Sequence, residues 1–263
     1  MKKIKTLLLI LPLAISAQAA VVITDSGTAT KTAWTSGTQT FTSGDFSFSL
    51  TGVDKLVVTF GINHSSVDPS RVVNSVSYNG QAMTEAVGLG GDSTSFQSAI
   101  YYLDNPGTTL GDLVLSTTNG YGMGVTIMGL SGTALGHGAT GGTESSSSTS
   151  LTTTASNSFV IASILAPGEV GNGLTVPAAQ SSFSAGPGTL IDYSSALDSA
   201  IGTGYQTIAS SGTNLTPTFY IGATTFDIAA TTVAAEFLAA IPEPSTTLLL
   251  GVLGSMLLLR RRR

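Results

Sequence analysis

Two histidines and the acidic residues spread along this 263-residue chain are the side chains that could take part in acid–base or nucleophilic chemistry. His64 lies four residues before Asp68 in a serine-containing segment, which supplies the residue types of a Ser-His-Asp hydrolase. No Gly-x-Ser-x-Gly elbow accompanies them, and His137 stands between two glycines. Because serine is abundant along the whole chain, a serine close to a histidine and an aspartate is expected by chance. We therefore expect no catalytic residues and no enzymatic activity, and a secreted hydrolase is the third reading of function.

The acidic residues stand singly rather than in ligand-like clusters, and no Asp-x-Asp-x-Asp-Gly calcium loop occurs. We expect neither a metal site nor a cofactor, and we expect these carboxylates to keep the surface soluble. They are Asp54, Glu85, Asp92, Asp104, Asp112, Glu169, Asp192 and Asp227.

Aromatic side chains are the residues that a sugar-binding surface would need, because their faces stack on sugar rings. Trp34 is the only tryptophan, and Tyr101 and Tyr102 are the next candidates, together with Tyr121 and Tyr193. Buried aromatic residues are the commoner explanation for such positions. A carbohydrate-binding module therefore remains the alternative function.

The composition favours strands as the elements that position these residues. Charged residues make up 10% of the chain, glycine occurs 31 times, and Thr, Val, Ile and Ser dominate the middle. Cysteine is absent, so no disulfide can contribute. Residues 20–240 contain 14 acidic and three basic residues, a net charge of −11 that excludes nucleic acid as a partner.

The N-terminus has the three parts of a secretory signal peptide. Three lysines precede the apolar residues 7–15, and the small residues Ala17 and Ala19 then form a cleavage site. This pattern predicts that residues 1–19 pass through the Sec machinery and are removed by signal peptidase after Ala19. The following domain is then exported across the inner membrane.

The C-terminus also has three ordered parts. Pro242, Glu243 and Pro244 hold the backbone extended and open to an enzyme, and Ser245 can cap a helix after them. Residues 245–259 would form an apolar helix of about 22 Å, which is short for a hydrocarbon core of about 30 Å. A cytoplasmic basic cluster ends the chain: Arg260, Arg261, Arg262 and Arg263.

Residues 242–263 resemble the PEP-CTERM sorting signal of Gram-negative bacteria in all three parts. The resemblance implies that the membrane enzyme exosortase binds the chain transiently, removes the helix, and releases or transfers the protein to the cell surface or extracellular matrix. It also implies an association with exopolysaccharide. A simple tail anchor is the alternative interpretation of the same residues.

The middle of the chain predicts short strands separated by turns, with Asn79-Gly80 as a type I′ hairpin. Val76, Tyr78, Ile100 and Tyr102 are expected to point inward. The predicted strands cover residues 46–50, 55–62, 71–78, 82–87, 98–103, 112–117, 122–130, 157–165, 205–209, 217–223 and 230–238.

Two stretches, Ser75 to Thr84 and Ala99 to Gly107, resemble an exported bacterial jelly-roll-like module. The resemblance implies a fold and no activity. Residues 138–150, rich in Gly and Ser, are expected to be a loop or a hinge.

The resulting prediction is an all-β chain with one antiparallel, jelly-roll-like β-sandwich over residues 20–240. A signal peptide at 1–19 precedes it, and a sorting signal at 241–263 with a short transmembrane helix follows it. The expected function is that of a non-enzymatic surface or matrix protein.

Overall fold

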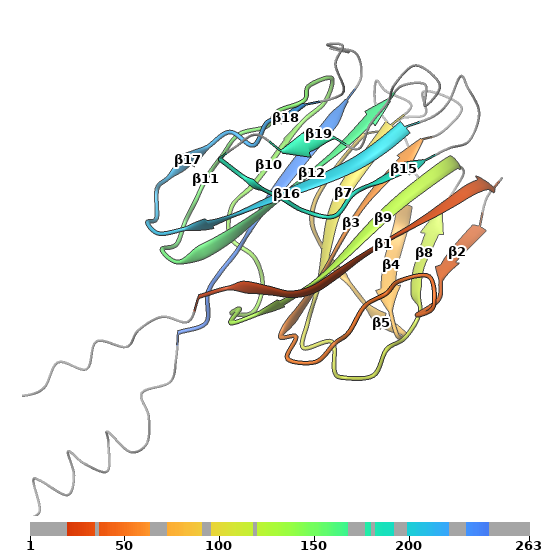
Figure 1. Ribbon diagram of the computed structural model, residues 1–263, viewed down its shortest axis with the longest axis horizontal. Helices are drawn as coiled ribbons and strands as arrows, with labels where there is room; N and C mark the ends of the chain where they lie inside the picture. Colours follow the sequence, from red (N-terminus) through yellow and green to blue (C-terminus); the bar gives the residue numbers. More distant parts are fainter. Residues whose placement is uncertain are drawn as a thin grey trace, which may run out of the picture.

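The computed structural model describes residues 20–34, 37–63, 73–90, 96–117, 120–167, 177–179, 182–191, 199–220 and 230–241. Within these residues the elements are strands, and every strand pairing is antiparallel (Figure 1). The all-β antiparallel prediction is therefore confirmed. The predicted signal peptide and the predicted sorting helix lie outside the described residues.

A five-stranded central sheet lies in the middle of the molecule (Figure 1). Its order is β1-β9-β3-β7-β6, with the bounds Val22–Trp34, Gly120–Ser131, Lys55–Asn63, Phe96–Asp104 and Thr84–Gly90. Every residue of β3 is buried. A strand buried on both faces reads as a nearly continuous apolar run, which is the pattern of Leu56 to Ile62.

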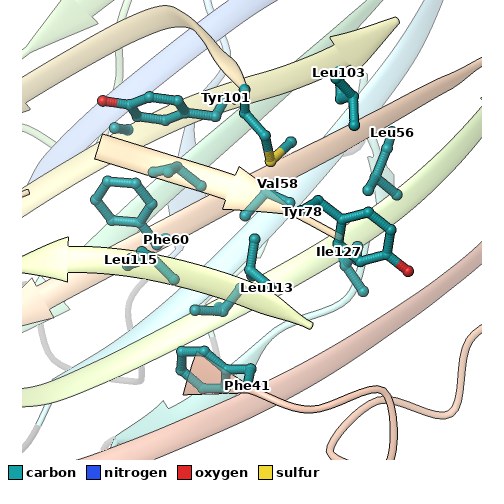
Figure 2. Close-up of a cluster of buried hydrophobic side chains, with 14 of the residues drawn as sticks. Phe41, Leu56, Val58, Phe60, Tyr78, Tyr101, Leu103, Leu113, Leu115 and Ile127 are labelled. Carbon is teal, nitrogen blue, oxygen red and sulfur yellow. The ribbon is translucent and has the colours of Figure 1, made fainter. Parts of the chain in front are cut away.

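One face of the central sheet packs on a four-stranded sheet, which we call the N-terminal outer sheet. Its order is β2-β8-β4-β5, with the bounds Gly37–Phe41, Leu113–Thr117, Val73–Tyr78 and Gln81–Ala82. Figure 2 shows side chains of both sheets meeting, with Val58 and Phe60 of the central sheet near Leu113 and Leu115. Alternate residues of β3 supply this core, because successive side chains of a strand point to opposite faces.

The other face of the central sheet packs on a C-terminal outer sheet. Its order is β10-β19-β12-β16-β14, and β15 also pairs with β16. A second apolar core joins the two sheets through residues such as Val57, Ile100 and Ile161. The strand bounds are Thr140–Thr143, Thr231–Phe237, Ser158–Pro167, Ser199–Ile208, Ser184–Ala185 and, for β15, Thr189–Ile191.

Two short ribbons cover the outer face of the C-terminal outer sheet. Val160 and Ile164 of β12 pack there in a third core with Leu215 and Phe219 of the ribbons. The ribbons pair β11 with β17 and β13 with β18, with the bounds Leu151–Thr152, Asn214–Leu215, Ala178–Ala179 and Phe219–Tyr220. The architecture is thus a stack of three main sheets, which is consistent with the predicted antiparallel β-sandwich.

The Asn79-Gly80 turn confirms its prediction. Both residues have positive φ, 48° and 74°, and Tyr78 pairs with Gln81 across the turn. Two successive positive φ values define a type I′ turn, which Asn-Gly adopts at low cost. The four residues predicted to point inward, Val76, Tyr78, Ile100 and Tyr102, are all buried.

Two local predictions were wrong. Residues 46–50 form no strand, although Phe46 and Leu50 are buried in the first core. The alternation of apolar residues in this segment reflects the burial of its side chains. No neighbouring backbone pairs with the segment as a strand. In the predicted loop 138–150, residues Thr140–Thr143 form β10 and pair with β19.

Candidate functional site

The space between the central sheet and the C-terminal outer sheet has an apolar middle and polar ends. Along the inward face of β3, Lys55 and Asn63 stand at the two ends of the strand, and Val57 and Thr59 lie between them. Strand β7 follows the same gradient, whereas β12 and β19 have the apolar residues Phe159 and Phe237 at the Lys55 end. Buried polar groups outside the apolar middle are the places where chemistry or binding can occur.

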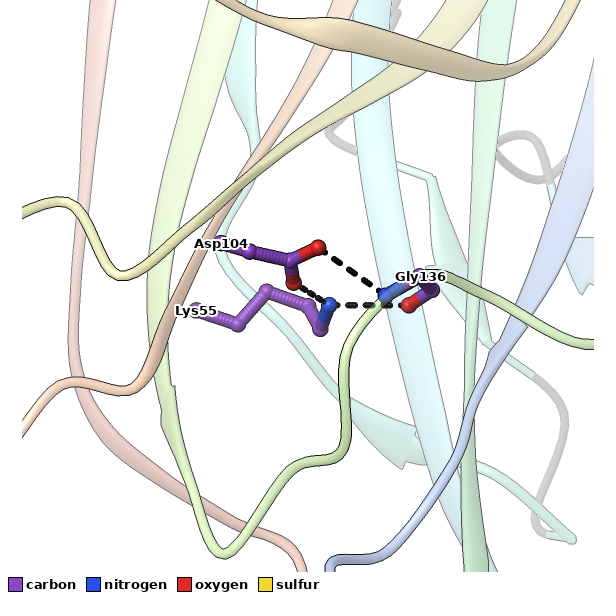
Figure 3. Close-up of polar contacts among 3 residues, drawn as sticks. All are labelled: Lys55, Asp104 and Gly136. Carbon is purple, nitrogen blue, oxygen red and sulfur yellow. Dashed lines mark hydrogen bonds and ion pairs between the residues drawn. The ribbon is translucent and has the colours of Figure 1, made fainter.

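Lys55, Asp104 and Gly136 form a compact polar cluster at one end of this space (Figure 3). The Lys55 side chain is completely buried and forms an ion pair with Asp104 through Oδ1. Lys55 Nζ also donates to the Gly136 carbonyl oxygen at 2.8 Å, and the Gly136 N–H donates to Asp104 Oδ2 at 2.9 Å. The backbone of one residue, Gly136, therefore contacts both charged groups.

Strand register explains why the two charges meet. Lys55 is the first residue of β3, Asp104 is the last residue of β7, and the two are directly paired across the antiparallel ladder. Directly opposite residues place their Cβ atoms about 4.5–5.5 Å apart on the same face. Asp104, expected from the sequence to keep the surface soluble, is 25% exposed and is paired with a buried lysine.

Two aromatic rings enclose the Lys55 ammonium group. Its Nζ lies 4.6 Å from the ring centroid of Tyr102 and 5.8 Å from that of Phe237. Burial lowers the pKa of Lys55, and the hydrogen bond and charge of Asp104 oppose that effect. The net shift is downward, so the site favours the neutral amine more than water does.

The connector between β9 and β10, residues 132–139, brings Gly136 to this cluster. Ala134 N–H donates to the Leu238 carbonyl at 2.8 Å, and Gly132 N–H donates to Asp54 Oδ2 at 2.6 Å. Gly136 has a φ of 75°, a conformation that suits glycine. The connector is therefore fixed against the ends of β3 and β19.

Glu236 of β19 holds the far end of the same connector. It is completely buried, and its carboxylate accepts hydrogen bonds from Ala139 N–H at 2.9 Å, Thr154 N–H at 2.9 Å and Ala155 N–H at 3.1 Å. The Thr154 hydroxyl adds a bond of 2.8 Å. Burial raises the pKa of Glu236, but hydrogen bonds from Ser158, Ala139 and Thr154 outweigh it, and the net shift is downward.

Buried hydroxyl groups also occur in the central sheet and the C-terminal outer sheet. Ser98, Ser163, Ser199 and Thr231 each have a buried hydroxyl oxygen without a hydrogen-bond partner among the described residues. Ser199 and Thr231 begin β16 and β19, Ser98 is the third residue of β7, and Ser163 lies in the middle of β12. Sequence reasoning did not single out these residues, because serine and threonine are common along the whole chain.

Two of the aromatic residues proposed for sugar stacking, Tyr101 and Tyr102, are packed inside. Tyr101 is 6% exposed, stacks on Phe60, and donates its hydroxyl to Glu85 Oε2 at 2.7 Å. Tyr102 is 8% exposed and meets His137 and Phe237 edge to face. Neither ring presents a free face to a polysaccharide, which argues against both as sugar contacts. Trp34 ends β1, paired with Gly120.

The remaining candidates divide between the described residues and the rest of the chain. The Nδ1 atom of His137 lies 2.9 Å from the Gly138 carbonyl oxygen. Among the described residues, no three His, Cys, Asp or Glu side chains gather as metal ligands would, and no helix is long and apolar enough to cross a membrane. Several predicted positions lie outside the described residues: His64, Asp68, Ala17, Ala19, Pro242, Glu243, Pro244 and residues 260–263.

Comparison of the chain with models of protein families, with curated proteins and with solved structures finds no match.

Proposed function

We propose that this protein is a non-enzymatic, exported surface or matrix protein that exosortase sorts and cleaves at its C-terminus. The observation that carries the proposal is the ordered tail of residues 242–263, in which Pro-Glu-Pro, an apolar segment and four arginines follow one another. The predicted signal peptide at the other end agrees with this route. An association with exopolysaccharide is part of the proposal.

The positions of the two chain ends support a tethered domain with one outward face. Near the N-terminal end, Val22 pairs with Ser131. Near the C-terminal end, the Ala240 N–H donates to the carbonyl oxygen of Gly132, which follows Ser131, at 2.8 Å. Both ends of the exported part therefore leave the sheets at the same place (Figure 1). A chain held by its C-terminus before cleavage would present the opposite end of the sheets, where β3, β12 and β1 finish, to the outside.

We propose a jelly roll as the finer description of residues 20–131. The central sheet contains the order β1-β9-β3-β7, and the N-terminal outer sheet has the order β2-β8-β4-β5. The chain alternates between these sheets, as it does in two four-stranded sheets wound together as Greek keys. Strand β6 extends the central sheet by one strand, and the C-terminal outer sheet is an addition to this plan.

The sorting proposal is tested by the intact mass of the protein recovered from the cell surface. We expect the wild-type protein to lack residues 245–263, and we expect Glu243→Ala to retain them in the membrane fraction. Ser245→Ala leaves Pro-Glu-Pro intact and is the matched control, which should be processed like the wild type. A full-length tail on the wild-type surface protein would instead indicate an ordinary anchor.

Binding to exopolysaccharide needs a separate measurement. The wild-type protein should sediment with polysaccharide purified from the producing strain, and Trp34→Ala should sediment equally if association is passive. A specific loss in Trp34→Ala, with unchanged thermal unfolding, would favour the carbohydrate-binding alternative over a passive matrix protein.

A further inference from the structure

In the cluster of Lys55, Asp104 and Gly136, an amine and a carboxyl group lie in contact, as the two reactants of an amide bond would. The buried amine of Lys55 contacts the carboxyl group of Asp104, whose side chain is 25% exposed, and both residues come from neighbouring strands of the central sheet (Figure 3). An ordinary ion pair accounts for the contact itself. It does not require that the N–H and the carbonyl oxygen of one residue, Gly136, each bind one of the two partners.

Gly136 offers the two hydrogen bonds that a side-chain amide needs. Its carbonyl oxygen already accepts from Lys55 Nζ at 2.8 Å, and its N–H already donates to Asp104 Oδ2 at 2.9 Å. A Lys55–Asp104 amide would keep its N–H pointed at the first group and its carbonyl oxygen at the second. The product would therefore leave none of these three polar groups unpaired.

We propose that Lys55 and Asp104 condense into an intramolecular isopeptide bond, so that Lys55 is a self-modification site joining β3 to β7. Nothing in the proposed sorting function requires this bond, and the two proposals stand or fall separately. The cross-link would join strands in a chain that contains no cysteine for a disulfide.

The reaction is balanced without a further reactant. The ammonium group of Lys55 first passes one proton to Asp104 Oδ1, which gives a neutral amine and a neutral carboxylic acid. The Nζ lone pair then forms a bond to Asp104 Cγ, and the negative charge on Oδ2 is held by the Gly136 N–H. A second proton passes from Nζ to Oδ1, the Cγ–Oδ1 bond breaks, and one water molecule leaves.

The residues around Lys55 and Asp104 favour formation of the amide over its hydrolysis. Burial destabilises the charged pair, and the downward shift of the Lys55 pKa acts in the same direction. Tyr102 and Phe237 flank the amine and limit the access of water to the product. Well-oriented intramolecular partners can reach effective molarities of about 10⁵–10⁸ M, which lowers the barrier to bond formation between them.

Peptide mapping of the full-length chain tests the proposal directly. Digestion with trypsin and a glutamyl endopeptidase, after denaturation, cuts after Lys31, Arg71, Glu85 and Glu144. A free Lys55 yields residues 32–55 and 56–71 as separate peptides. A cross-linked Lys55 resists trypsin, so residues 32–71 should stay joined to residues 86–144, with a mass one water lower than the sum of the two peptides.

Two variants separate the proposal from incomplete digestion. Lys55→Arg retains the positive charge but cannot form the same amide, and Asp104→Ala removes the carboxyl group; both should give only unbranched peptides of full mass. Asp104→Asn should restore the branched peptide by loss of ammonia. Recovery of peptides 32–55 and 56–71 at full mass from the folded wild-type protein, without any branched species, would overturn the proposal.

Discussion

Replacing Glu236 with glutamine should destabilise the protein by about 2–4 kcal/mol, because the carboxylate accepts several hydrogen bonds inside the fold. Oε2 accepts from Ala139 N–H, Thr154 N–H and the Thr154 hydroxyl, and Oε1 accepts from Ala155 N–H and, at 3.1 Å, from the same Thr154 N–H. In the best amide orientation the carbonyl oxygen keeps the first three bonds. The amide NH₂ then faces the Ala155 N–H and leaves it unpaired.

The magnitude follows from these contacts. A buried donor without an acceptor costs about 1–3 kcal/mol, and the three remaining bonds weaken because their acceptor is no longer charged. Glu236→Ala removes every acceptor and should cost about 3–5 kcal/mol. Glu144→Gln is the matched control: Glu144 is half-buried and accepts from Gly90 N–H at 3.2 Å, so its loss should cost about 1 kcal/mol or less.

Urea unfolding at several pH values is the assay. Because the pKa of Glu236 is lowered in the folded state, its carboxylate contributes stability above the unfolded value of about 4.3, and that contribution is lost as pH falls through the folded pKa. The gap between wild type and Glu236→Gln should therefore be full at neutral pH and shrink in acid. A gap below about 0.5 kcal/mol, or one that acid leaves unchanged, would refute the reasoning.

Three further substitutions probe separate parts of the fold. Gly80→Ala, at a φ of 74°, should lower the free energy of unfolding by about 1–2 kcal/mol. The control Gly44→Ala, at a position without positive φ, should change it by less than about 0.5 kcal/mol. Equal effects of the two substitutions would argue against the turn assignment. Gly61→Ala places a Cβ 2.7 Å from Leu165 Cδ1 across the two sheets and should cost about 1–3 kcal/mol. Its combination with Leu165→Ala should cost less than the sum of the two single changes in a double-mutant cycle, and strict additivity would deny the contact. Tyr101→Phe removes the hydroxyl bonded to Glu85 and should lower stability by about 1 kcal/mol in thermal or urea unfolding, and an unchanged midpoint would contradict that bond.

Local patterns predicted most of the longer strands and one turn, but β1 and β2 were not among the predicted strands. Residues 55–62 have no long polar stretch and were predicted as a strand, and β3 occupies Lys55–Asn63. Asn79-Gly80 specified its hairpin because few other residue pairs accept two positive φ values. In contrast, β10 was missed because Thr-Gly-Gly-Thr has no apolar alternation. Its strand conformation comes from pairing with β19, which is distant in the sequence.

The clusters of buried charge depend on the tertiary arrangement, and the sequence analysis did not find them. Lys55 begins one apolar run and Asp104 ends another, which is a weak signal that two antiparallel neighbours pair their charged ends. The contribution of Gly136 could not be anticipated, because it requires the connector to fold back between the sheets. Burial of Tyr101 and Tyr102 likewise follows from a central sheet that is covered on both faces.

The two charged clusters act on one segment, and this explains how the C-terminal outer sheet is held to the rest. The connector of residues 132–139 leaves the central sheet after β9 and enters the outer sheet at β10. Lys55 and Asp104 hold its Gly136, while Glu236 accepts from Ala139 and Glu236 O from the Gly138 N–H. A Cβ on Gly138 would lie 2.3 Å from Glu236 Oε2, so the approach itself requires glycine. Gly138, the first residue of the segment predicted as a loop or a hinge, instead lets the end of the connector pack closely against β19.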